Sequence, residues 1–142
     1  MSDAMSEAVR KLLGRTSVVA GTIAVVLSPI PLADEIALLP VFAVMTSRIG
    51  KTHQLAFRDV PWRPIASTTV AALAARATLN LAVSYIPGVA AAANAVSAVT
   101  LTHILGRYVD EVCTSPATAR PLGVREIAVR MKDALSRRPQ TA

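Results

Sequence analysis

Long apolar runs alternate with short polar segments along this chain, and prolines mark the boundaries. Apolar residues recur at helical spacing from 4 to 13, and polarity then disappears up to Leu27. A second apolar run covers about 32–51, a polar connector follows at 53–63, and two further runs cover about 65–85 and 89–112. Prolines interrupt the pattern between the first and second runs and between the third and fourth. The pattern therefore predicts four helices, joined in pairs by proline turns.

The two pairs resemble each other in sequence. A shift of about fifty-six positions, without a gap, aligns both turns and both helix ends. It lays Ser28, Ile30 and Pro31 on Ser84, Ile86 and Pro87, and it lays Ile49, Gly50 and Lys51 on Leu105, Gly106 and Arg107. We interpret this as two copies of one unit. Each unit consists of an apolar helix, an Ile-Pro turn and a second apolar helix that ends in glycine and a basic residue.

We expect an all-α protein with two consecutive hairpin repeats that form a four-helix unit. The repeats cover about 5–56 and 61–112 within a domain of residues 1–115. A linker, an amphipathic helix and a tail follow at 116–142. The predicted structural turn residues are Pro29, Pro31, Pro87 and Gly88.

The last predicted helix has one apolar stripe and a basic remainder. The stripe consists of Val124, Ile127, Ala128, Met131 and Leu135. Such a helix could dock on the bundle or lie on anionic headgroups, and the sequence favours neither.

Composition restricts the chain to two classes. Hydrophobic residues make up 53% and charged residues 17%, against about 25% charged in ordinary soluble domains. The mean hydropathy of +0.48 is high for a soluble protein, but much of it comes from alanine. The candidates are a compact helical bundle and a set of membrane-embedded hairpins.

The placement of basic residues favours a membrane over nucleic acid. The net charge is +6, yet no Lys or Arg occurs between Arg15 and Arg48 or between Arg76 and Arg107. Aromatic residues are only 4%, which is few for a surface that stacks on bases. Bases beside long uncharged runs are typical of anionic lipid contacts. The candidate membrane-surface residues are Arg10, Lys11, Arg15, Arg48, Lys51, Trp62, Arg63, Arg107, Arg125, Arg130 and Lys132. For Trp62, packing beneath a loop is an equal alternative.

The apolar arms are short for crossing a bilayer. Each has roughly sixteen residues, or about 24 Å of helix, against about 30 Å of hydrocarbon, so spanning and dipping both remain open. The positive-inside rule places the termini and the connector in the cytoplasm. Asp34 and Glu35 are a candidate functional pair, expected at the far surface or in a polar pocket. The alternative is that they are helix-dipole partners in water.

No catalytic or metal-binding motif is present in the sequence. We find no phosphate-binding glycine loop, no G-x-S-x-G, no H-E-x-x-H and no paired-cysteine spacing. His103 lies in an apolar run and is expected to be a core residue. The single Cys113 excludes an internal disulfide. We therefore expect no enzyme activity, no cofactor and no metal.

The residues around the Ile-Pro turns carry a family resemblance. They are Pro29-Ile30-Pro31-Leu32-Ala33-Asp34, Met45 with Arg48-Ile49, Ile86-Pro87-Gly88, Asn94, and Thr100 to Gly106. They resemble the YcjF-like, GTPase-associated domain of unknown function over about residues 15–112. Two departures are Leu32, where that family has glycine, and Ile49 before Gly50, where an aromatic is usual. The resemblance implies a helical protein of the bacterial inner membrane that acts beside a GTPase, and it implies no catalytic residue.

Three hypotheses follow from the sequence. The first is a non-enzymatic membrane-associated anchor or scaffold, acting beside a GTPase or another protein in trans. The second is a soluble helical interaction module that closes a bundle or a homo-oligomer through its alanine faces. The third is a membrane-perturbing effector. None of them includes a nucleic-acid partner.

Overall fold

The computed structural model describes residues 5–27, 32–83, 86 and 89–137. Within them the chain is all-α, as expected. The helices are α1 (Glu7–Val26), α2 (Ala33–Thr52), α3 (Trp62–Val83), α4 (Val89–Thr114) and α5 (Val124–Ser136), with a short 3₁₀ turn η1 (Pro116–Thr118) before the last. The predicted turn residues Pro29, Pro31, Pro87 and Gly88 lie outside the described residues.

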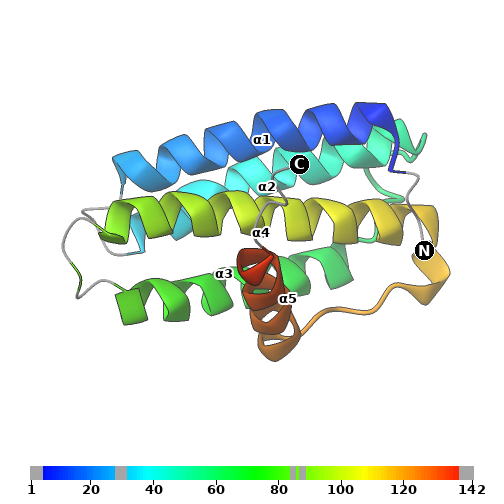
Figure 1. Cartoon of the computed structure of the whole chain (residues 1–142). Helices are drawn as coiled ribbons and strands as arrows, with labels where there is room; N and C mark the ends of the chain where they lie inside the picture. The colour runs from blue at the N-terminus through cyan, green and yellow to red at the C-terminus, as the bar shows by residue number, and fades with distance from the viewer. Residues whose placement is uncertain (1–4, 28–31, 84–85, 87–88, 138–142) are drawn as a thin grey trace.

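Helices α1 to α4 lie side by side, and α5 lies across α3 and α4 (Figure 1). Helix α1 packs against α4 and α2, while α3 packs against α4 and α5. Helices α2 and α3 make few direct contacts. The ends of α1 and α3 and the starts of α2 and α4 lie at one end of the bundle, and the 53–61 connector lies at the other end (Figure 1).

Close backbone approach fixes the pair α1 and α4. A Cβ atom on Gly106 would overlap the Leu13 side chain, which is fully buried. Small residues at helix interfaces allow this spacing. Around this contact the core contains Val9, Leu101 and Leu105.

The helix ends differ from the sequence prediction by a few residues. Helix α3 begins at Trp62 rather than Ile65, because Pro64 falls in its first turn, where proline is tolerated. Pro40 lies inside α2. Under the fifty-six-residue shift, Ala33 and Val89, the first residues of α2 and α4, coincide. The duplication itself stays a prediction.

Helix α5 docks on the bundle by the middle of its apolar stripe. Ile127 and Met131 are fully buried, while Val124 and Leu135 at the stripe's ends are about half exposed. The Leu122 N–H donates to Thr68 Oγ1 on α3 at 2.9 Å. The start of α5 is capped by Glu126, whose Oε2 accepts from the Gly123 N–H at 3.1 Å. Docking therefore holds α5 across α3 and α4, and its basic side chains stay exposed.

Candidate functional site

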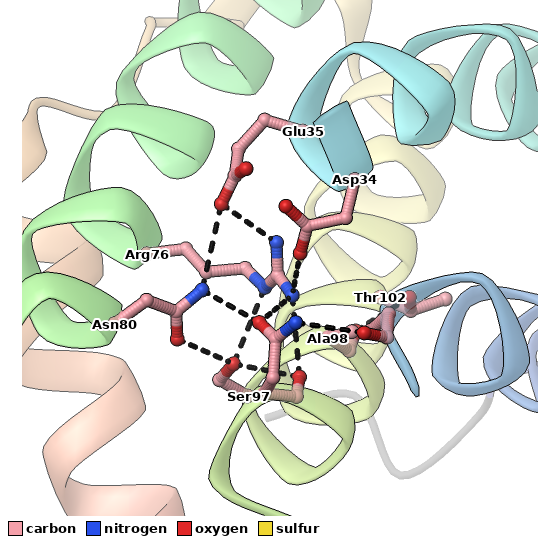
Figure 2. A network of polar contacts seen from close by, with 9 residues as sticks. Asp34, Glu35, Arg76, Asn80, Ser97, Ala98 and Thr102 are labelled. Atoms are coloured by element: carbon pink, nitrogen blue, oxygen red, sulfur yellow. Dashed lines mark hydrogen bonds and ion pairs between the residues drawn. The ribbon is translucent and has the colours of Figure 1, made fainter. Parts of the chain in front are cut away.

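A fully buried arginine lies near the end of the bundle where α2 and α4 begin. Arg76 on α3 has no exposed surface. Its Nη2 donates to Asp34 Oδ2 at 2.7 Å, and its Nη1 donates to Glu35 Oε1 at 2.9 Å (Figure 2). Both carboxylates come from the first turn of α2 and are also buried. The candidate pair thus lies in a polar pocket inside the protein, not at a water-facing helix end.

Amides and a hydroxyl complete this buried cluster. The Arg76 Nε donates to Ser97 Oγ at 3.2 Å, and the Ser97 hydroxyl donates to the Asn94 carbonyl at 2.9 Å. Asn80 Nδ2 donates to Asn94 Oδ1 at 2.7 Å, and Asn94 Nδ2 donates to the Ala24 carbonyl at 2.8 Å. Ala24 is in the last turn of α1, where carbonyls lack helical partners. The cluster therefore links α1, α2, α3 and α4.

Two acids share one guanidinium, and their pKa values move apart. Burial and the hydrogen bond with Asp34 raise the pKa of Glu35 to about 7. Burial alone would also raise the pKa of Asp34, but hydrogen bonds with Glu35 and Arg76 outweigh it and hold that pKa below its ordinary value. The cluster therefore pairs Asp34 with Arg76 as ions and allows Glu35 to carry a proton near neutral pH.

The outer surface at this end of the bundle is apolar. In the described stretches 16–27, 32–47, 64–83 and 89–106, the only Asp, Glu, Lys or Arg side chains are the three in the cluster. Valine, leucine and isoleucine face outward instead. We call this surface the apolar tip, and define it by Val25, Val26, Leu32, Ile36, Leu81, Ile86 and Val89, which are 47–69% exposed.

Exposed basic residues begin where the apolar surface ends. Every predicted membrane-surface cation is exposed: Arg10, Lys11, Arg15, Arg48, Lys51, Arg63, Arg107, Arg125, Arg130 and Lys132. Arg15 and Arg48 line one cavity of about 330 Å³ between α1 and α2. We use the name basic collar for Arg15, Arg48, Arg107, Arg130 and Arg137.

Trp62 is half-buried beside the connector. Its Nε1 donates to the Phe57 carbonyl at 2.7 Å, and the two rings lie 4.9 Å apart. This is the packing arrangement that the sequence left as an alternative to an interfacial anchor. Exposed Phe57 gives the pair an apolar surface.

Sequence reasoning missed Arg76 as a site residue. The available signal was its position, because it is the only charged residue between Arg63 and Arg107. The expectation for His103 was wrong: it is exposed on α4 and lines a cavity under α5 rather than the core. Its apolar neighbours belong to the other faces of the helix.

Cys113 is a buried free thiol whose pKa is raised to about 11, by burial and then by Asp110. Within the described residues, no group of three or more His, Cys, Asp and Glu side chains is placed to hold a metal ion.

Two described stretches, Trp62–Ala82 and Val89–Thr114, are long and apolar enough to cross a membrane. Comparison of the chain with protein-family models, curated proteins and solved structures finds no match.

Proposed function

We propose that this protein is a non-enzymatic membrane anchor that inserts its apolar tip into one leaflet of an anionic bilayer. The observation that carries the proposal is the direction in which the charged side chains point at the end of the bundle that bears the apolar tip. Asp34, Glu35 and Arg76 all turn inward onto one another, while Val26, Ile36 and Leu81 face outward. In water this arrangement exposes apolar surface and buries ions, and both are unfavourable. In lipid the same arrangement is the favourable one.

The depth of the uncharged surface fits a single leaflet. From Thr16 to Leu27, α1 rises about 17 Å, and half of a bilayer's hydrocarbon core is about 15 Å. The position of α5 is consistent with insertion to the same depth. This helix lies crosswise over the middle of α3 and α4 (Figure 1). Its apolar side is docked on the bundle, while Arg125 and Lys132 are exposed and would reach anionic headgroups at that level.

The basic collar would then lie among anionic headgroups. Each Lys or Arg near such a surface contributes about 1 kcal/mol of attraction. By the positive-inside rule this is the cytoplasmic leaflet, and the connector faces the cytoplasm. A GTPase or another protein in trans would bind on that side, and a bacterial inner membrane satisfies these requirements.

Vesicle flotation tests the insertion. The full-length protein is mixed with vesicles of phosphatidylcholine and phosphatidylglycerol and floated in 1 M NaCl, where the Debye length is about 3 Å. We expect the protein to stay with the vesicles, because apolar insertion is insensitive to salt screening. Complete release by salt or by carbonate would contradict insertion. A monodisperse dimer without detergent would instead support closure of the tip by a second copy.

A thiol label on the apolar tip distinguishes a protein that dips into one leaflet from one that spans the bilayer. Cys113 is buried and unreactive, so Val26→Cys introduces a single accessible thiol. We expect an impermeant maleimide to react with it in detergent, but from neither side of sealed vesicles. Reaction from the far side would show that the hairpins cross the bilayer. Thr52→Cys, exposed at the other end of α2, is the control and should react from the near side.

A further inference from the structure

The cavity between α4 and α5 is bordered by three basic side chains. It has a volume of about 510 Å³ and is bordered by Arg107 on α4, by Arg130 on α5 and by Arg137 directly after α5. Within the described residues, none of these three guanidinium groups has an ion pair or a side-chain hydrogen bond. The exposed arginine Arg120, by contrast, makes a two-pronged pair with Glu126. The cavity therefore holds three guanidinium groups without an ion-pair partner in the described part of the chain.

The remaining wall has a polar and an apolar part. Thr100 and His103 add a hydroxyl and an imidazole, and Asp133 is the one acidic side chain. Burial, and then Arg107, lower the pKa of His103, which favours the neutral imidazole. Three arginines and one aspartate leave a net charge of +2. Val99, Ile104 and Ala134 supply an apolar wall.

We propose that this cavity binds the phosphate monoester headgroup of an anionic lipid. A phosphate monoester carries about −1.5 to −2 charge at neutral pH and has three strong acceptor oxygens. Guanidinium groups match these oxygens in geometry and charge. A phosphodiester headgroup carries one charge and has fewer free oxygens, so it fits the cavity less well.

The position of the cavity favours a lipid over free phosphate. It lies under α5, at the level where the proposed function places the membrane surface, and this inference rests on that placement. The apolar wall lies on the α4 face that continues toward the apolar tip through Val96 and Val89, both exposed. An acyl chain can leave the cavity along this face while the phosphate stays with the arginines.

The test measures selectivity between lipids rather than affinity alone. Binding to vesicles containing phosphatidic acid is compared with binding to phosphatidylglycerol vesicles of equal zeta potential. We expect the wild-type protein to bind phosphatidic acid at least tenfold more tightly. In the double variant Arg130→Gln/Arg137→Gln, the ratio of the affinity for phosphatidic acid vesicles to that for phosphatidylglycerol vesicles should fall to about one.

Arg125→Gln/Lys132→Gln is the matched control, because it removes the same charge from the same helix outside the cavity. This variant should weaken binding to both vesicles equally and keep the ratio. A wild-type ratio near one, or an equal loss of ratio in both variants, would overturn the site.

Competition identifies the source of the phosphate. Short-chain phosphatidic acid should release the protein from the vesicles, and the same concentration of inorganic phosphate should not. Equal competition by inorganic phosphate would overturn the lipid assignment. Failure of the wild-type protein to float with any vesicle in 1 M NaCl would contradict the membrane proposal, whereas loss of the ratio alone contradicts only this site.

Discussion

Replacing Arg76 by methionine tests whether the buried cluster holds the bundle together. Methionine fills a similar volume but leaves Asp34 and Glu35 buried without their cation. Removing one partner of a buried ion pair costs about 3–5 kcal/mol, because an uncompensated charge stays inside the protein. For a chain of this size that corresponds to a fall in Tm of roughly 10–15 °C.

The loss should depend on pH. Without Arg76, each acid can avoid a buried charge only by taking up a proton, so its pKa rises. Arg76→Met should therefore be closest to the wild type near pH 5 and least stable near pH 8. Thermal unfolding followed by circular dichroism in a mild detergent, at both pH values, measures this difference.

Two further variants separate the charge effect from packing. Arg63→Met removes an exposed arginine from the same helix and should change stability by less than about 0.5 kcal/mol. Asp34→Asn/Glu35→Gln/Arg76→Met leaves no buried charge and should recover most of the lost stability. A fall of less than about 1 kcal/mol in Arg76→Met, equal at both pH values, would refute the burial of the acids.

Three further predictions concern single residues. Because the pKa of Glu35 is raised to about 7 in the folded state, folding stability should fall as pH rises from about 4.5 to 7, by up to about 3 kcal/mol. Glu35→Gln should remove this slope in pH-dependent unfolding curves, and an unchanged slope would exclude Glu35 as its source. Leu32 has a left-handed backbone with φ of 65° and an exposed side chain. Leu32→Gly should therefore raise stability by about 1 kcal/mol but weaken vesicle binding, whereas reduced stability would show that the leucine packs. Val26→Glu should abolish vesicle flotation with little change in Tm, because Val26 is 68% exposed. Thr52→Glu, exposed at the other end of α2, should still float, and equal loss in both variants would refute a role specific to the tip.

The helices were predictable from the sequence because their signals are local. Apolar runs, prolines and glycines set the helix bounds to within about three residues. The stripe on α5 indicated an apolar face, but it did not decide between docking on the bundle and lying on headgroups. The 3₁₀ turn at Pro116–Thr118 was not expected. It depends on a linker tied to the bundle by tertiary contacts, including the Tyr108 hydroxyl, which donates to the Arg120 carbonyl at 2.8 Å.

The buried cluster could be predicted only in part. The adjacent acids were noticeable because their surroundings are apolar, but their partner is 41 and 42 residues away on another helix. Hydrophobic periodicity does not indicate which helices become neighbours. The same limit applies to His53, whose Nε2 lies 2.7 Å from Asp110 Oδ1 at a separation of 57 residues.

The buried cluster and the apolar tip depend on each other structurally. Helices α2 and α3 share little packing surface, so an apolar end alone would leave their separation poorly defined. Arg76 reaches from α3 to both acids of α2 and thereby sets that separation from inside. Its hydrogen bonds are effective because the protein itself keeps water from the cluster, and the unpaired alternative is costly. The inner ions therefore fix the two helices whatever surrounds the tip. Among the described residues, no charged side chain is left on the outside of this end, and the exposed valines and leucines there are what favour lipid over water.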